Sequence, residues 1–275
     1  MSASKATSKS NRRQAAAIIQ KLSPDSSART LQALSNVRLA QRTTNKETQL
    51  ILLWSAIENL LSDVPDKMVR IHYFLDSMVP AICLNYARRY SCAIYDEFCA
   101  HHKNKTRGIL KYVEHTDKDD HTRFIRFMFD PTHSLARNAL LSNLDDNPLL
   151  RNRLWKLFEN FGEVESLHRS TDSYEKRVEW QISRIYRARN SLMHGGQKPR
   201  YISPLVMNAY EYFKIVYFTI AYRAELSTDS MDTEYILSSV IFDFESRKSE
   251  IELMRKEEKR GPLDIDRYLA VFDKV

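Results

Sequence analysis

The sequence predicts an all-α fold, and three observations support this prediction. Apolar residues recur every three or four positions over most of the chain, which is the spacing of one face of a helix. No segment outside the expected loops shows the strict apolar–polar alternation of a half-buried strand. Only 5 of the 275 residues are glycine, which leaves few residues for the tight turns of β-hairpins. Neither G-x-G-x-x-G nor G-x-x-x-x-G-K-[ST] occurs, so two common nucleotide-binding loops are excluded.

The N-terminal third is expected to contain three helices after a disordered tail at residues 1–10. Residues 11–22 and 28–42 have helical patterns, and Ser23-Pro24-Asp25 separates them. Residues 45–62 form the first strongly amphipathic segment, which Asn45 can cap and Pro65 ends. The apolar face of this segment consists of Leu50, Leu53, Trp54, Ile57, Leu60 and Leu61. We expect Trp54 to be a core residue.

The rest of the chain also has a helical pattern. Pro80 is expected to kink or break the pattern of residues 66–101, and Asp120 to cap a helix ending at Phe129. Asn147 before Pro148 is typical of a helix start, and Gly162 of a helix end. Other helices are predicted within residues 102–122 and over 131–144, 173–193, 204–226 and 233–260. The prediction is a helical bundle with an N-terminal helical extension and a long C-terminal helix.

Positive charge is concentrated at the N-terminus. The chain carries +7 overall, but residues 1–46 hold nine Lys or Arg against Asp25 alone, so the remaining residues carry −1. A basic segment attracts polyanions such as nucleic acid or anionic lipid. Two interpretations stay open: an arm that binds such a partner, and a tail that keeps the protein in solution.

Composition also bears on location. Cys83, Cys92 and Cys99 form no C-x-x-C pair, and their odd number does not suggest a disulfide framework. No stretch approaches the ~18 apolar residues of a membrane-spanning helix, and the apolar run at residues 15–19 is too short for a signal peptide. We therefore expect a cytoplasmic, soluble protein with no membrane partner.

A group of metal-ligand residue types lies between residues 99 and 121. Its spacing matches no known ligand template, and the segment is polar and charged. We interpret it as a solvated connector and expect no metal and no cofactor. Its members are Cys99, His101, His102, His115, Asp117, Asp119, Asp120 and His121.

The strongest candidate for chemistry lies in the helix predicted at residues 173–193. Its apolar seam runs through Val178, Ile182 and Ile185, and Arg189 occupies the next step. Because a guanidinium stays charged, Arg189 must either meet a carboxylate across the core or face an anion-binding cleft. Asn190 and His194 share a helical face, and an imidazole can exchange a proton near neutral pH. The structural alternative is that Arg189 pairs with a core acid and His194 caps the helix.

These residues resemble a known motif. Arg189-Asn190-x-x-x-His194 is similar to the R-N-x-x-x-H motif of HEPN domains, and I-Y-R-A-R-N-S-L-M-H-G-G at residues 185–196 resembles the ApeA-like HEPN group. Members of that group typically carry an earlier amphipathic helix with Trp and Glu, as at Trp54 and Glu58. The resemblance covers residues 45–226 and implies an insertion near 95–145. It leaves residues 1–44 as a basic, partly helical arm and 227–275 as a helical extension.

The resemblance implies a helical bundle that dimerises, so that two motifs line one composite cleft. Many members are metal-independent endoribonucleases of toxin–antitoxin or phage-defence systems, which implies RNA and a regulatory or antitoxin protein as partners. By this resemblance His194 moves the proton and Arg189 holds the phosphorane charge. Asn190 would orient the scissile phosphate or His194. Glu58 would pair with Arg189 across the bundle, unless it points to solvent.

Two other functions remain open at this point. The chain could be a non-catalytic HEPN module that binds RNA, a nucleotide or a protein, since some members of the family lack activity. It could also be a nucleic-acid-binding regulator that acts through residues 1–46.

Overall fold

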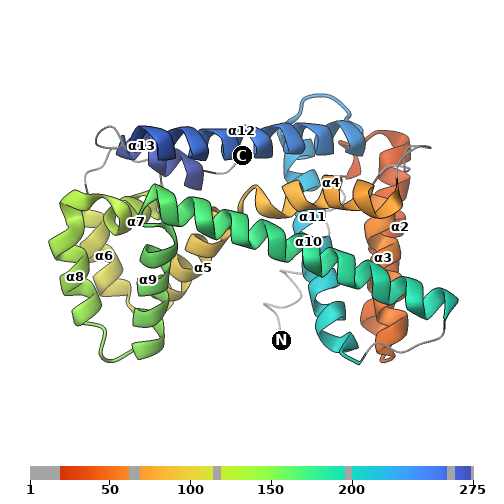
Figure 1. Cartoon of the computed structure of the whole chain (residues 1–275), viewed down its shortest axis with the longest axis horizontal. Coiled ribbons are helices and arrows are strands. Elements are labelled where there is room, and N and C mark those ends of the chain that lie inside the picture. Colours follow the sequence, from red (N-terminus) through yellow and green to blue (C-terminus); the bar gives the residue numbers. More distant parts are fainter. Residues whose placement is uncertain (1–18, 62–68, 114–118, 196–199, 259–263, 274–275) are drawn as a thin grey trace. The chain divides into compact units, whose positions relative to one another are not determined.

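The structure, a computed structural model, is all-α in the part of the chain that it describes, which comprises residues 19–61, 69–113, 119–195, 200–258 and 264–273. Figure 1 shows the helices in chain order. The single isolated β-bridge among these residues pairs Leu22 with Met231. None of the described helices is both long enough and apolar enough to cross a bilayer.

The chain divides into two compact units. Unit 1 consists of Met1–Ile82 and Lys176–Phe244, and unit 2 consists of Cys83–Glu175 and Glu245–Val275. Two long helices, α10 (Val164–His194) and α12 (Thr233–Glu258), each contribute residues to both units.

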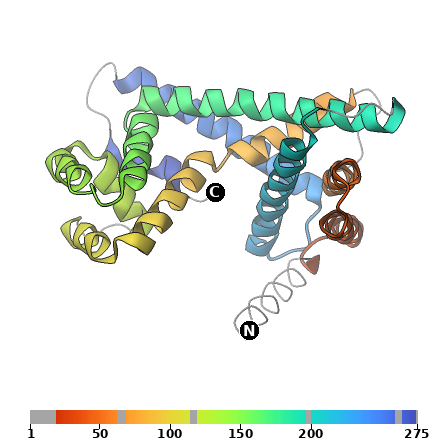
Figure 2. The same ribbon diagram turned by 90° about the horizontal axis from the view of Figure 1, so that it is seen from below.

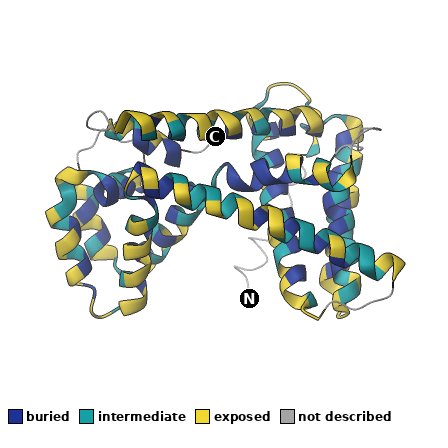
Figure 3. Cartoon of the chain, viewed as in Figure 1, coloured by how far each residue is buried: buried dark blue, intermediate teal, exposed yellow. Residues whose placement is uncertain are grey.

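Unit 1 holds both markers of the resemblance. It contains α2 (Pro24–Arg42), α3 (Lys46–Leu60), nearly all of α4 (Arg70–Cys83) and α11 (Ile202–Leu226). The second half of α10 and the first half of α12 complete it. The predicted apolar face of α3 is fully buried, as is the predicted seam of α10 as far as Ile185. These buried positions recur at helical spacing, and Figure 3 shows the resulting alternation of buried and exposed residues along the helices.

The inner end of the predicted N-terminal arm is folded onto unit 1. Helix α2 packs against α3, and Figure 2 shows the two helices side by side. Ser23 N donates to the Met231 carbonyl at 2.9 Å, and the Ser26 hydroxyl accepts from Thr233 N at 3.0 Å. Residues 24–42 are therefore part of the folded unit. The predicted tail at 1–10, and the predicted helix at 11–22 as far as residue 18, lie outside the described residues.

Unit 2 is a second helical assembly with its own aromatic core. Its other elements are α5 (Tyr86–His101), α6 (Lys103–Tyr112), α7 (Asp120–Phe129), η1 (Pro131–His133), α8 (Ser134–Ser142), α9 (Pro148–Phe161), α13 (Ile265–Leu269) and η2 (Ala270–Phe272). Phe98, Phe124, Phe161, Tyr268 and Phe272 are almost completely buried. The Tyr268 hydroxyl donates to the Phe161 carbonyl, which satisfies the one polar atom of this side chain.

Several predicted helix ends are confirmed by their capping contacts. The Asn45 side chain accepts from the backbone N–H groups of Glu47 and Thr48, at the start of α3. Asn147 likewise caps α9 by accepting from Leu150 N at 3.1 Å. These contacts join residues two or three positions apart, so the sequence pattern is sufficient to predict them.

Other predicted boundaries are wrong. Helix α2 begins at Pro24 because Ser23 caps it and proline is tolerated at the first helical position. Of the kink or break predicted at Pro80, the break is wrong: Pro80 lies inside α4, and the helix ends before Leu84–Asn85. Asp119 rather than Asp120 caps α7, accepting from Thr122 N at 2.8 Å. Helix α10 begins at Val164, well before the predicted residue 173.

The two units and the predicted domains divide the chain differently. The expected insertion near 95–145 lies within unit 2, while α2 and α3, which the prediction places in separate domains, both lie in unit 1. Part of the predicted C-terminal extension, 227–275, belongs to each unit. The three predicted domains remain a prediction, and the two units describe how the chain packs.

Candidate functional site

A buried tryptophan holds the two marker helices of unit 1 together. Trp54 on α3 is fully buried, which confirms its prediction as a core residue. Its ring lies 5.1 Å from that of Phe74 on α4 and 5.5 Å from that of Tyr186 on α10, measured between centroids. Aromatic pairs at these distances pack firmly. One turn after Trp54, Glu58 faces α10 at the level of the motif.

An ion pair joins the two markers. Arg189 Nη2 lies 3.4 Å from Glu58 Oε2, and the two side chains are only 17% and 23% exposed. Of the two environments predicted for Arg189, the structure therefore shows the carboxylate across the core. Glu58 contacts Arg189 as predicted, and the alternative in which it points to solvent is wrong. This contact is common to the catalytic interpretation and to the structural one, in which Arg189 simply pairs with a core acid.

The pair is incompletely satisfied. Glu58 Oε1 and Arg189 Nε are both buried, and neither has a hydrogen-bond partner among the described residues. A buried polar atom without a partner carries a desolvation cost. The guanidinium thus keeps hydrogen-bonding capacity that Glu58 alone does not use.

Asn190 contacts Arg189 directly. Its carboxamide oxygen accepts from Arg189 Nη1 at 3.1 Å, and the residue is half-buried. The predicted role of Asn190 was to orient a phosphate or His194. In the structure its oxygen orients the guanidinium, which leaves the amide NH₂ to act on another group.

His194 is the last residue of α10 and is exposed. Gly195 N donates to the Ser191 carbonyl at 2.9 Å, so the helical hydrogen-bond pattern ends immediately after the imidazole. Arg189 and His194 are five positions apart, which gives a net rotation of about 140° around the helix and a rise of about 7.5 Å. The two side chains therefore leave α10 on different sides, while Asn190 and His194 share one face.

One histidine of the predicted connector is in fact buried, which corrects the interpretation of that segment as solvated. His121 lies in α7, and its Nε2 is 3.0 Å from the Ser91 hydroxyl. Burial and the positive charge of Arg88 lower the pKa of His121 from 6.5 to about 4. The apolar neighbours of α7 produce this burial, and sequence spacing carries no signal for it.

The remaining members of that predicted cluster do not form a metal site in the described part of the chain, where no group of three or more His, Cys, Asp or Glu side chains converges. His115 and Asp117 lie outside the described residues. His102 packs against Phe98, with ring centroids 5.7 Å apart.

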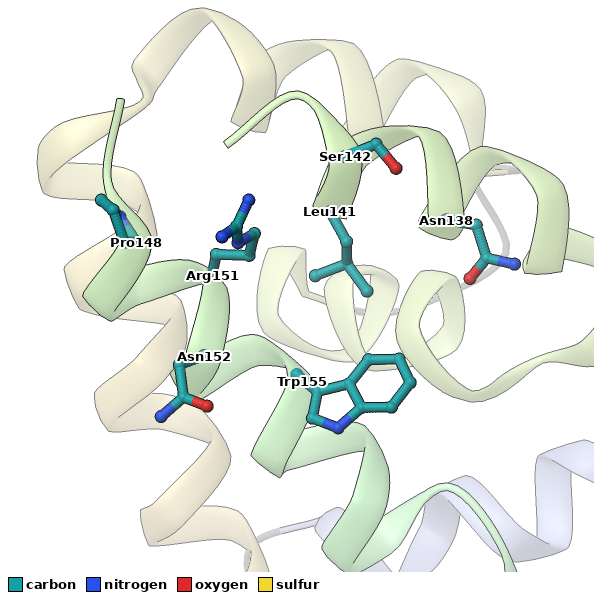
Figure 4. Close-up of a pocket in the computed structure, with 7 residues that line it drawn as sticks. All are labelled: Asn138, Leu141, Ser142, Pro148, Arg151, Asn152 and Trp155. Carbon is teal, nitrogen blue, oxygen red and sulfur yellow. The ribbon is translucent and has the colours of Figure 1, made fainter. Parts of the chain in front are cut away.

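Unit 2 has an open concavity of about 610 Å³ between α8 and α9 (Figure 4). Leu141 and Trp155 form its apolar part, while Asn138 and Asn152 contribute amides. Its one charged side chain, Arg151, is paired with Asp145. None of the lining side chains can act as a general base near neutral pH, so the Arg189–His194 segment is the better candidate for catalysis.

Comparison with known proteins adds no assignment: no protein-family model, curated protein or solved structure matches this chain. Any function therefore has to be argued from its own residues.

Proposed function

We propose that this chain is a metal-independent endoribonuclease of the HEPN type. One observation carries the proposal: a half-buried arginine, held by Glu58 and Asn190, precedes an exposed histidine at the end of the same helix. A cation held in place and a proton carrier at the end of the same helix are two of the groups that phosphodiester cleavage needs. A toxin or an effector of anti-phage defence is the biological role that we propose.

The chemistry uses the substrate's own nucleophile. The 2′-hydroxyl oxygen bonds to the adjacent phosphorus while the bond from phosphorus to the 5′-oxygen breaks. One imidazole takes the proton of the 2′-hydroxyl, and another gives a proton to the leaving 5′-oxygen. Arg189 stabilises the charge on the phosphorane, and Asn190 holds the guanidinium in place. DNA lacks the 2′-hydroxyl and is spared.

Two histidines would best share the two proton transfers, and each motif offers one. We therefore propose a homodimer in which the two copies of His194 face a shared cleft. A cognate regulatory or antitoxin protein would control the activity of such an enzyme in its cell.

The test is cleavage of total RNA by the purified protein, with and without EDTA. His194→Ala and Arg189→Ala should each abolish cleavage, EDTA should have no effect, and the products should end in 2′,3′-cyclic phosphate. The matched control is His101→Ala, because His101 is also an exposed last residue of a helix, α5. It should retain full activity.

Two results would refute the proposed mechanism: metal-dependent cleavage, or full activity in His194→Ala. Arg189→Ala leaves Glu58 half-buried without its partner, so its thermal unfolding is measured in parallel. Arg189→Lys keeps the positive charge but not the planar fork, and should recover folding without recovering activity.

The alternative is a non-catalytic module that binds RNA, a nucleotide or a protein. The Glu58–Arg189 pair favours it, since that contact suffices to explain why a charged residue lies in the seam. This alternative predicts RNA binding without cleavage under every condition of the same experiment.

A further inference from the structure

The exposed side of α10 carries a second pattern, opposite its buried seam. Residues at 177, 180, 184, 187, 191 and 194 step by three and four, so they lie along one face of the helix. We call this face the α10 stripe; it consists of Arg177, Trp180, Arg184, Arg187, Ser191 and His194. All six residues belong to unit 1. None is acidic, and His194 is the end of the stripe.

An aromatic ring and a guanidinium are already stacked on this stripe. Trp180 is 54% exposed, and the guanidinium carbon of Arg184 lies 4.5 Å from the centroid of its ring. This cation–π contact holds the indole in place with part of its surface in solvent. A fixed, exposed aromatic ring is the element on which proteins stack unpaired bases.

Two arginines of the stripe, Arg184 and Arg187, form no ion pair with a described carboxylate. Arg187 is exposed, and its Nε donates to the Ser183 carbonyl at 3.3 Å, which leaves both Nη groups at the surface. Within the described residues, no carboxylate lies within ion-pair distance of Arg184 or Arg187. By contrast, Arg267 in unit 2 is paired with Glu250 and Glu257.

We propose that the α10 stripe binds single-stranded RNA and leads it to His194. This proposal rests on the proposed function for its account of the end of the stripe, but the binding itself does not require cleavage. From residue 177 to residue 194 the helix rises about 25 Å, enough for several nucleotides. Arg184 and Arg187 contact phosphates, which guanidinium groups bind in bidentate fashion, while Trp180 stacks on a base.

The same groups select against other polyanions. In a duplex the bases are stacked on each other and are not accessible to Trp180, so single strands should bind more tightly than duplexes. An acidic polypeptide would use the arginines but would gain no stacking from the indole.

The test measures binding of a fluorescein-labelled single-stranded RNA by anisotropy, using the full chain with His194→Ala so that the RNA stays intact. In this background Trp180→Ala should weaken binding about tenfold, and Trp180→Phe should restore most of the loss. Arg184→Gln and Arg187→Gln should each lower the slope of log K against log salt by about 0.7.

Matched controls come from unit 2. Trp155 is 52% exposed and Arg107 is exposed, so Trp155→Ala and Arg107→Gln remove equivalent groups elsewhere on the surface. Both should leave binding unchanged. Circular dichroism of each variant shows whether its helices are retained, and all five positions should tolerate the change because none is buried.

Four results would overturn the proposal. Three concern RNA: unchanged affinity in Trp180→Ala, an equal loss in Trp155→Ala, or equal affinity for a duplex of the same sequence. The fourth is binding of polyglutamate that falls equally in Trp180→Ala, which would identify an acidic protein as the partner. Stripe-dependent binding of RNA that the wild-type chain does not cleave would support the stripe and refute the ribonuclease. Cleavage that needs His194 but is unaffected by Trp180→Ala would support the ribonuclease and refute the stripe.

Discussion

At the scale of single residues, two ionisable side chains that are largely buried differ in charge: Arg189 is charged and His121 is neutral. Arg189 remains charged and meets Glu58 and Asn190, because a guanidinium cannot lose its proton at working pH. Among the described residues His121 contacts no carboxylate, and burial keeps its imidazole neutral by lowering its pKa. The Ser91 hydroxyl donates to the Arg88 carbonyl at 2.9 Å, so it accepts from His121 Nε2, which assigns the proton of the neutral ring to that nitrogen.

His121 should make the stability of the protein depend on pH. Its pKa is about 4 in the folded protein and about 6.5 when unfolded. Between these values the unfolded state binds the extra proton, so the contribution is complete above pH 6.5 and is lost as the pH falls to 4. The size of this effect is at most about 3 kcal/mol.

The measurement is the free energy of unfolding in urea between pH 4 and 7.5. His121→Gln keeps a donor toward Ser91 and does not titrate. Protonation of carboxylates also destabilises the protein in acid, so the variant serves as the reference. The wild type should lose more free energy of unfolding than His121→Gln over this range. Parallel curves for the two proteins would show that His121 is not held neutral by the fold.

At the scale of elements, α2 buries mainly small residues and exposes two of its leucines. Its buried positions are Ser26, Thr30, Ala33, Val37 and Ala40, while Leu31 and Leu39 are about half exposed. Small residues on the contact face let α2 lie close to α3. The larger hydrophobic residues of α2 therefore do not identify its contact face, which its packing against α3 decides.

Two truncations of the N-terminal arm should distinguish the effect of its charge on RNA binding from the effect of its packing on stability. Removing residues 1–18 deletes four basic residues and no described contact, whereas removing residues 1–42 also deletes α2. Both truncations should weaken non-specific RNA binding, the shorter one lowering the slope of log K against log salt by up to about 3. Only the longer truncation should lower the melting temperature, because it exposes α3.

Salt titrations of RNA binding and thermal unfolding by circular dichroism check these outcomes. Turnover at saturating RNA should survive the shorter truncation, since Arg189 and His194 lie outside the arm. Loss of function on removal of residues 1–18 would instead favour a regulator that acts through its arm. An unchanged melting temperature without residues 1–42 would contradict a structural role for α2.

At the scale of the whole molecule, the chain builds two compact units from interrupted segments. Each unit combines an early segment with a later one, and α10 and α12 each supply residues to both. Such an arrangement ties the candidate site in unit 1 to helices that continue into unit 2. The proposed function adds a second copy, with a two-fold axis beside the C-terminal half of α10.

The dimer has a direct test. Light scattering during size-exclusion chromatography should give a mass of roughly twice 32.3 kDa for the purified chain. A dimer is expected because one motif supplies one imidazole for the two proton transfers. A strictly monomeric protein that still cleaves RNA would refute the composite site. The mass of His194→Ala is the control, because this variant should dimerise without being active.

The sequence by itself determined the helical class, most helix positions and the caps at Asn45 and Asn147, because these depend on residues within one or two turns. It also singled out Arg189 by its place in an apolar seam, and Glu58 by a resemblance. Only the folded chain brings the two side chains together, since they are 131 positions apart in the sequence. The tertiary structure likewise decided the burial of His121, the contact face of α2 and the division into units. Each of these results from packing between distant segments, which local pattern does not encode.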